Sequence, residues 1–229
     1  MVSRCEIPLI VWLIWAALVA EITVSIIGRS WPSLMISVIT LILTWLPIAY
    51  SDRFGIKIPI RFATTAVIFI FATLFLGEVG DFYERFWWWD VILHTGSALA
   101  FGIVGFVLIF MLFEGDRFAA PPFALAFLSF CVAMAIGGVW EIFEFAMDQA
   151  FGLNMQKSGL IDTMWDLIVD ALGALTAAVT GYYYLKEPSE PGALRSWITS
   201  FIDKNRDHFK KLENKKSREI PEEGSERGD

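Results

Sequence analysis

Ionisable side chains lie at helical spacing inside, or at the ends of, strongly apolar segments of this 229-residue chain. A charged Asp in the interior of a bilayer costs roughly 3 kcal/mol on insertion scales. A chain that keeps several such groups is therefore expected to use some of them together. The set comprises Asp90, His94, Glu141, Glu144, Asp148, Asp162, Asp166 and Asp170.

The spacing of these groups favours a shared polar site that holds a divalent cation. Residues i and i+4 lie above one another on an α-helix, so Asp90 and His94 face one way, as do Asp166 and Asp170. One imidazole with several carboxylates suits Zn²⁺, Mn²⁺ or Fe²⁺, whereas carboxylates alone suit Mg²⁺ or Ca²⁺. These four residues are the candidate metal ligands.

Two further carboxylates are candidates for general acid–base catalysis. Glu141 and Glu144 lie on one face of their predicted helix, and a carboxylate beside a metal site can take a proton from water. Asp148 and Asp162 are expected at the mouth of the same site. Two other readings stay open: a hydrogen-bonded network that only locks the helices together, and a proton-linked site.

The bulk composition indicates an all-α, multi-pass membrane protein. Hydrophobic residues make up 56% of the chain, in blocks of about 20 residues, the length that crosses a bilayer as a helix. The six predicted spans are roughly 8–27, 32–50, 60–77, 91–113, 121–147 and 163–185. Leu18-Val19-Ala20 matches a signal-peptide cleavage site poorly, so the first block is expected to remain.

Charge and cysteine content exclude some function classes. The net charge of -7 gives no nucleic-acid-binding signature, so the expected partner is the lipid bilayer. Cys5 and Cys131 fall at different membrane levels, and no disulfide is expected between them. The substrate and the oligomeric state are not indicated by the sequence.

Basic residues predict the orientation in the cell membrane. Six of them flank the spans on the side of the termini, and three flank the other side, which puts both termini in the cytoplasm. The first set is Arg4, Arg53, Lys57, Arg61, Arg117 and Lys186; the second is Arg29, Arg85 and Lys157. The acidic site then lies near the extracytoplasmic face.

The chain divides into three predicted parts. Residues 1–186 form the transmembrane helical domain. Residues 187–212 contain a linker and an amphipathic helix, whose apolar stripe with following basic residues is expected on the anionic inner leaflet. Residues 213–229 are charged, almost without apolar side chains, and are expected to be disordered.

The fourth and sixth spans resemble each other at an offset of 76 residues. Trp89-Asp90 aligns with Trp165-Asp166, and His94 aligns with Asp170. The match predicts a duplicated helical hairpin, in which spans three and four correspond to spans five and six. Duplication would bring the two i,i+4 pairs face to face.

Two stretches of the sequence carry a family pattern. One contains Trp140-Glu141-Ile142-Phe143-Glu144, Asp148, Gly152-Leu153-Asn154-Met155-Gln156, Asp162-Thr163-Met164, Asp166 and Gly173-Ala174; the other contains Asp90, His94 and Gly96. Over roughly 60–185 they resemble the YjdF-like inner membrane proteins, although Val91 stands where that family often has Lys. The D-x-x-x-H spacing is more faintly similar to VanZ-like proteins. The resemblance implies a membrane fold with a shared polar site, and it supplies no reaction.

Three functions fit these observations. The first is a metal-dependent membrane enzyme that acts on a lipid-linked or envelope substrate, with Glu141 or Glu144 as the general base. The second is an ion or proton transporter or sensor that uses the same carboxylates. The third is a structural or accessory membrane protein.

The predicted topology can be tested by thiol labelling in intact cells. Cysteines introduced by Glu84→Cys and Gln156→Cys should react with an impermeant reagent, because both positions fall on the extracytoplasmic side. A cysteine introduced by Gly55→Cys should stay unlabelled. Labelling at position 55 alone would reverse the orientation.

Overall fold

A computed structural model of the chain describes residues 7–49, 59–113, 120–152, 154–186 and 195–205, and every regular element within these ranges is a helix. Six helical segments are long and apolar enough to cross a membrane, which confirms the predicted all-α, multi-pass fold class. The elements are α1 (Leu9–Gly28), α2 (Trp31–Ala49), α3 (Ile60–Ile70), η2 (Phe71–Val79), α4 (Phe82–Arg85), α5 (Trp88–Phe113), α6 (Pro122–Phe151) and α7 (Leu160–Lys186).

Local sequence explains where several helices begin and end. Pro121 precedes α6 and Pro122 occupies its first turn, where a missing backbone N–H costs nothing. Gly152, at φ 66°, ends α6 in the left-handed conformation that glycine adopts without strain. The third span changes from α-helix to a nine-residue π-helix, η2, whose wider turn continues to Gly80 with an N–H bond to the Phe75 carbonyl.

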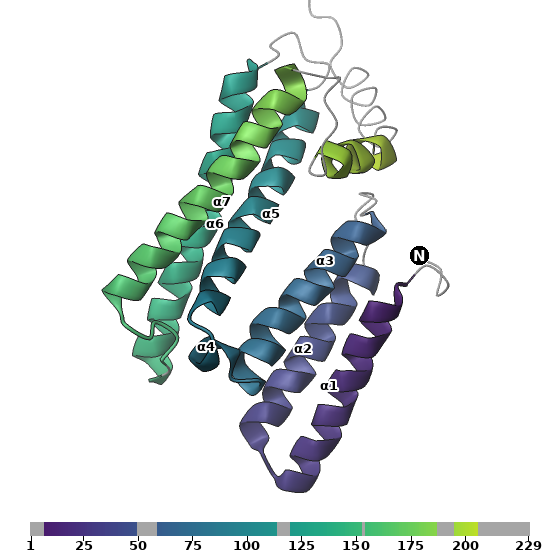
Figure 1. Cartoon of the computed structure of the whole chain (residues 1–229), viewed down its shortest axis with the longest axis vertical. Coiled ribbons are helices and arrows are strands. Elements are labelled where there is room, and N and C mark those ends of the chain that lie inside the picture. Colours follow the sequence, from purple (N-terminus) through teal and green to yellow (C-terminus); the bar gives the residue numbers. More distant parts are fainter. Residues whose placement is uncertain (1–6, 50–58, 114–119, 153, 187–194, 206–229) are drawn as a thin grey trace, which may run out of the picture.

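The helices form two groups of three (Figure 1). One group contains α1, α2 and the third span, and the other contains α5, α6 and α7. Most contacts lie within each group; α4 joins η2 to the start of α5. The start of α1 and the end of α7 lie at the same end of the molecule (Figure 1), as an even number of spans requires.

Small residues let the second group pack tightly. A Cβ on Gly173 of α7 would overlap the Thr95 carbonyl of α5, and one on Gly102 would overlap Ala177. The Ser129 hydroxyl of α6 donates to the Gly102 carbonyl at 2.7 Å. Such close backbone approach is how helices associate in a bilayer, where no hydrophobic difference separates lipid from protein. Large apolar side chains remain on the outside, among them Ile27, Leu160 and Phe123.

The segment 195–205 is helical and lies across the ends of α3 and α5 (Figure 1). Its apolar stripe packs on protein: Ile198, Phe201 and Ile202 are buried in a cluster with Phe106 and Met111 of α5. The sequence places this stripe on the inner leaflet. In the structure, these side chains pack against apolar residues at the ends of α3 and α5, and contact of the helix with the inner leaflet stays a prediction.

Some predictions concern residues outside the described ranges. They are the disordered tail over 213–229, most of the linker, Cys5, and the basic residues Arg4, Arg53, Lys57 and Arg117. The duplication of a helical hairpin also stays a prediction, although α5 and α7 do pack against each other.

Gly173→Ala tests the close approach of α5 and α7. The added methyl group would meet the Thr95 backbone, so we expect it to lower the free energy of unfolding by about 1–3 kcal/mol. Gly96→Ala is the matched control, because a Cβ there meets nothing within 4 Å. Thermal unfolding in detergent measures both, and equal melting temperatures would contradict the tight contact.

Candidate functional site

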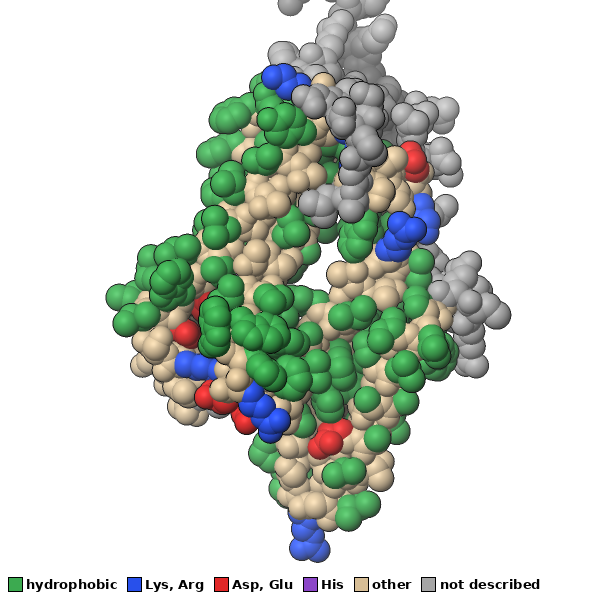
Figure 2. All heavy atoms as spheres, viewed as in Figure 1, with side chains coloured by type: hydrophobic (Ala, Val, Ile, Leu, Met, Phe, Trp, Pro, Cys, Tyr) green, Lys and Arg blue, Asp and Glu red, His purple; other side chains and the backbone are tan. Residues whose placement is uncertain are grey.

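Ionisable side chains gather at the end of the second group where α5 and α7 begin and α6 ends. We call this the polar end. Figure 2 shows acidic and basic side chains clustered at this end of the surface. Four ionisable side chains, His94, Glu141, Asp166 and Asp170, are buried here. Among the described residues they are the only ionisable side chains that are buried.

Asp90, His94 and Asp166 could hold one metal ion. Each offers a ligand atom, and these three atoms all lie within 4.8 Å of one another. Asp90 and His94 come from the first two turns of α5, and Asp166 comes from α7. The close contact between these two helices brings the three together, as their shared membrane level in the sequence predicts.

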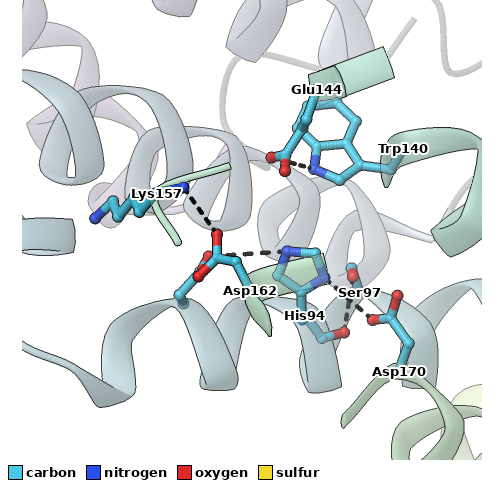
Figure 3. A network of polar contacts seen from close by, with 8 residues as sticks. His94, Ser97, Trp140, Glu144, Lys157, Asp162 and Asp170 are labelled. Atoms are coloured by element: carbon cyan, nitrogen blue, oxygen red, sulfur yellow. Dashed lines mark hydrogen bonds and ion pairs between the residues drawn. The ribbon is translucent and has the colours of Figure 1, made fainter. Parts of the chain in front are cut away.

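The His94 ring lies between two carboxylates (Figure 3). Its Nδ1 is 3.4 Å from Asp170 Oδ1, and its Nε2 is 3.8 Å from Asp90 Oδ1. Asp170, at 1% exposure, is the more deeply buried partner. The sequence groups Asp170 with the candidate metal ligands. In the structure, Asp170 lies next to His94 Nδ1, whereas Asp90 lies next to Nε2 on the other side of the ring. An Nδ1–H directed at Asp170 would leave the Nε2 lone pair facing Asp90.

Gly137 of α6 makes room for Asp170. A Cβ at position 137 would overlap the Asp170 carboxylate, whereas one at the neighbouring Gly138 would meet nothing within 4 Å. Neither Asp170 oxygen has a hydrogen bond of good geometry among the described residues. The position of the Asp170 carboxylate therefore depends on the space beside Gly137 and on its contact with the His94 ring, and not on a full set of hydrogen bonds.

The two candidate general bases differ in their surroundings. Glu144 accepts a 2.9 Å hydrogen bond from the Trp140 indole Nε1–H, one turn earlier on α6 (Figure 3). Glu141 is 4% exposed, and neither of its carboxylate oxygens has a hydrogen bond of good geometry among the described residues. Gln156 and Thr163 are the polar side chains that approach it. Glu141 is thus buried beside Gln156 and Thr163 without a hydrogen bond of good geometry to either side chain.

Asp148 and Asp162 organise the connection between α6 and α7. Asp148 accepts backbone N–H bonds from Met155 and Gln156 at 2.8 and 2.9 Å, and Asp162 accepts one from Lys157 at 3.1 Å. These bonds account for both carboxylates. They shape the rim of the polar end, and neither residue belongs to the group of three potential ligands.

Tyr83 and Lys157 also lie at the polar end, although neither was expected there as a site residue. The Tyr83 ring packs on the backbone of Gly77, and the Lys157 ammonium lies 5.0 Å from the ring centroid and 3.2 Å from Glu84. Burial raises the pKa of the Tyr83 phenol, and the nearby Asp90 carboxylate raises it further, so its hydroxyl keeps its proton. Tyr83 stands among several other aromatic residues, so nothing in the sequence distinguishes it as a residue of the polar end.

Gln156 and Thr163 are also additions to the site. The Gln156 side-chain amide donates to the Thr163 hydroxyl at 2.6 Å, beside the Glu141 carboxylate. Both residues stand in the stretch that carries the family pattern. Their position among the residues of that pattern is the sequence signal that indicates a role at the site.

The comparison with known proteins agrees with this architecture. Residues 10–187 match the family described as "Predicted membrane protein (DUF2238)". The chain belongs to this family. An uncharacterized protein of Thermotoga maritima is 29% identical over 136 residues, which are 59% of this chain and 69% of that protein. No solved structure matches the sequence.

The family match spans both groups of helices and includes every residue of the polar end. The YjdF-like resemblance is consistent with membership of DUF2238. The fainter likeness to VanZ-like proteins stays a prediction.

Gly137→Ala and Gly138→Ala form a matched pair of tests for the placement of Asp170. The first should displace the carboxylate and lower the free energy of unfolding by about 1–3 kcal/mol, and the second should leave it nearly unchanged. Thermal unfolding of the two variants side by side measures the difference. If both destabilise equally, Asp170 does not depend on the absence of a side chain at 137.

Proposed function

We propose that this chain is a metal-dependent membrane enzyme whose divalent cation binds Asp90, His94 and Asp166. The observation that carries the proposal is the convergence of their three ligand atoms within 4.8 Å, with Asp166 and His94 buried. The donor set of one imidazole and two carboxylates favours Zn²⁺, Mn²⁺ or Fe²⁺.

The position of Asp170 supports this assignment. Metal-bound histidines commonly donate their other ring N–H to a carboxylate, which fixes the ring and strengthens the ligand. Asp170 faces His94 Nδ1 in this way, and Nε2 faces Asp90. Asp170 is therefore proposed as a positioning residue, not as a ligand.

The balance of charge also supports a cation. Asp166, Asp170 and Glu141 are all buried around a single imidazole, and Glu141 and Asp170 lack hydrogen bonds of good geometry. Lys157 and Arg85, the described basic residues at this end, are paired with Glu84 and Asp81. Buried carboxylates without such compensation are costly, and a bound cation would supply it.

Glu141 is proposed as the general base. A bound divalent cation supplies Lewis acidity and makes water a better nucleophile. The Glu141 carboxylate would accept a proton from that water, and the nearby Gln156 and Thr163 side chains would orient the carboxylate. The substrate class that fits an opening at the membrane surface is a lipid-linked or envelope molecule.

An ion or proton carrier with the same carboxylates is the alternative. A carrier needs polar groups that continue across the membrane. Between the polar end and the opposite end of the second group, the buried side chains are mostly apolar, among them Phe106, Val107 and Ala177. No ionisable side chain among the described residues of this part is buried. This closed apolar layer favours a one-sided site over a pathway.

The proposed setting is the cell membrane, with both termini in the cytoplasm and the polar end at the outer leaflet. The common location of the α1 start and the α7 end supports a shared side for both termini, and the bias of basic residues supports the cytoplasm as that side. The helical domain over 1–186, with the shorter polar part after it, is proposed as the domain organisation.

Metal binding predicts a stabilisation that depends on cation concentration. A ligand at 100 times its dissociation constant stabilises the folded state by about 2.7 kcal/mol, so the correct ion should raise the melting temperature by roughly 5–10 °C. Zn²⁺, Mn²⁺, Fe²⁺, Mg²⁺ and Ca²⁺ are each titrated against purified protein. Asp166→Asn should abolish the response, and elemental analysis should show metal in the wild type and less in His94→Ala.

Asp81→Asn is the matched control, because Asp81 is an exposed carboxylate at the same end whose ion-pair partner is Arg85. This variant should respond to metal as the wild type does. A wild type indifferent to all five ions would remove the metalloenzyme from first place. If Asp166→Asn also lowered metal-free stability by about 1–3 kcal/mol, a structural lock would be the better account.

A further inference from the structure

A cavity lies at the opposite end of the molecule from the polar end. Its volume is about 270 Å³, and it is lined by Pro8, Ile60, Arg61, Thr64, Thr65 and Trp197. These residues come from the start of α1, the first two turns of α3, and the helix at 195–205, which lies across the end of α3 (Figure 1). We call this cavity the α3 pocket.

Two groups in the α3 pocket have no partner among the described residues. Arg61 makes no ion pair or hydrogen bond with any described residue, although it carries a permanent positive charge. The Thr64 hydroxyl oxygen is buried and has no hydrogen-bond partner among the described residues. Both groups can donate hydrogen bonds, so the pocket offers donors and one positive charge to an occupant.

The remaining walls are mostly apolar. Pro8, Ile60 and the Trp197 indole border the same space, and the Phe62 ring, 5.0 Å from the Trp197 ring, holds the indole in place. Arg61 stands at the beginning of a membrane span, the level at which lipid head groups meet the hydrocarbon. A ligand that suits this pocket therefore has an anionic group beside an apolar body.

We propose that the α3 pocket binds an anionic phospholipid of the surrounding bilayer. Arg61 contacts the phosphate, because a guanidinium presents paired N–H groups that match phosphate oxygens. Thr64 and Thr65 line the same pocket. The cavity is small next to the roughly 300–1,000 Å³ of typical ligand pockets, so it accommodates a head group or one end of a chain, and the rest of the lipid stays in the bilayer.

This proposal is independent of the metal site. Basic pockets between transmembrane helices are known places for anionic head groups. Here the pocket also includes Trp197, so an occupant would contact the helix at 195–205 as well as α1 and α3. A bound lipid would thus connect this helix to the first group of helices.

Native mass spectrometry of the full-length protein in detergent tests the proposal. Phosphatidylglycerol and phosphatidylcholine are titrated separately. The wild type should bind phosphatidylglycerol about tenfold more tightly, because the cationic choline of phosphatidylcholine offsets the charge of its phosphate and weakens the attraction to Arg61. Arg61→Gln should lose this preference, and Lys204→Gln should keep it, because Lys204 is an exposed basic residue on the helix at 195–205 that does not line the pocket.

Two further measurements complete the test. The first distinguishes a phospholipid from free phosphate as the source of the anion, and the second separates loss of binding from loss of folding. Inorganic phosphate should not displace the lipid at equal concentration, since it lacks the apolar body. Thr64→Val keeps the size of the side chain and removes the hydroxyl, and it should weaken phosphatidylglycerol binding while unfolding at a temperature near that of the wild type. Equal affinity of wild type and Arg61→Gln, equal affinity for both lipids, or displacement by phosphate would each overturn the proposal.

Discussion

The close approach of α5 and α7 is the interaction on which the rest of the structure depends. Gly173 lets the α7 backbone reach the Thr95 carbonyl, and this contact lies within about two turns of the ionisable residues of both helices. The Asp90–His94 pair of α5 therefore stands directly against Asp166 and Asp170 of α7. Larger side chains at the crossing would separate the helices and place each charged group alone in an apolar setting, where its burial would be too costly to persist. Tight packing and the polar site are thus two consequences of one contact.

The carboxylates of the polar end fall into two kinds. Asp148 and Asp162 accept backbone N–H bonds, and Glu144 accepts the indole N–H of Trp140, so their positions follow from local structure. Glu141 and Asp170 are more deeply buried, yet they lack comparable bonds among the described residues. A network that served only to lock helices would be expected to satisfy its most buried members first, because an unsatisfied buried group costs more than an exposed one. The pattern is the reverse, and it favours a site that completes its coordination with something other than the chain.

The sequence was sufficient for the parts of the structure that depend on local composition. Apolar block length predicts the six spans, and i,i+4 spacing predicts that His94 and Asp90 share a face, because both are properties of a single helix. It could not assign Asp170 to one ring nitrogen of His94, since that depends on rotation between α5 and α7. The π-helical turn at η2, the place of Tyr83 and the burial of the stripe at 195–205 likewise arise from contacts between distant segments. Contacts between distant segments produce no periodic pattern of residues. The sequence pattern therefore predicts where a helix lies in the chain, but not which segments pack against it.

Access to the polar end is limited to one direction. The Asp90 side chain is 32% exposed, whereas Asp166 and Asp170 are 4% and 1% exposed, so an incoming molecule meets Asp90 first. Tyr83 and Lys157 border this approach; the phenol keeps its proton and offers a neutral hydrogen-bond donor, and the ammonium offers a positive charge next to the acids. Beneath the site, the apolar layer around Phe106 closes the other direction. A molecule bound here would exchange with the surface it came from, which is the property that the proposed one-sided site requires and that a pathway across the membrane would lack.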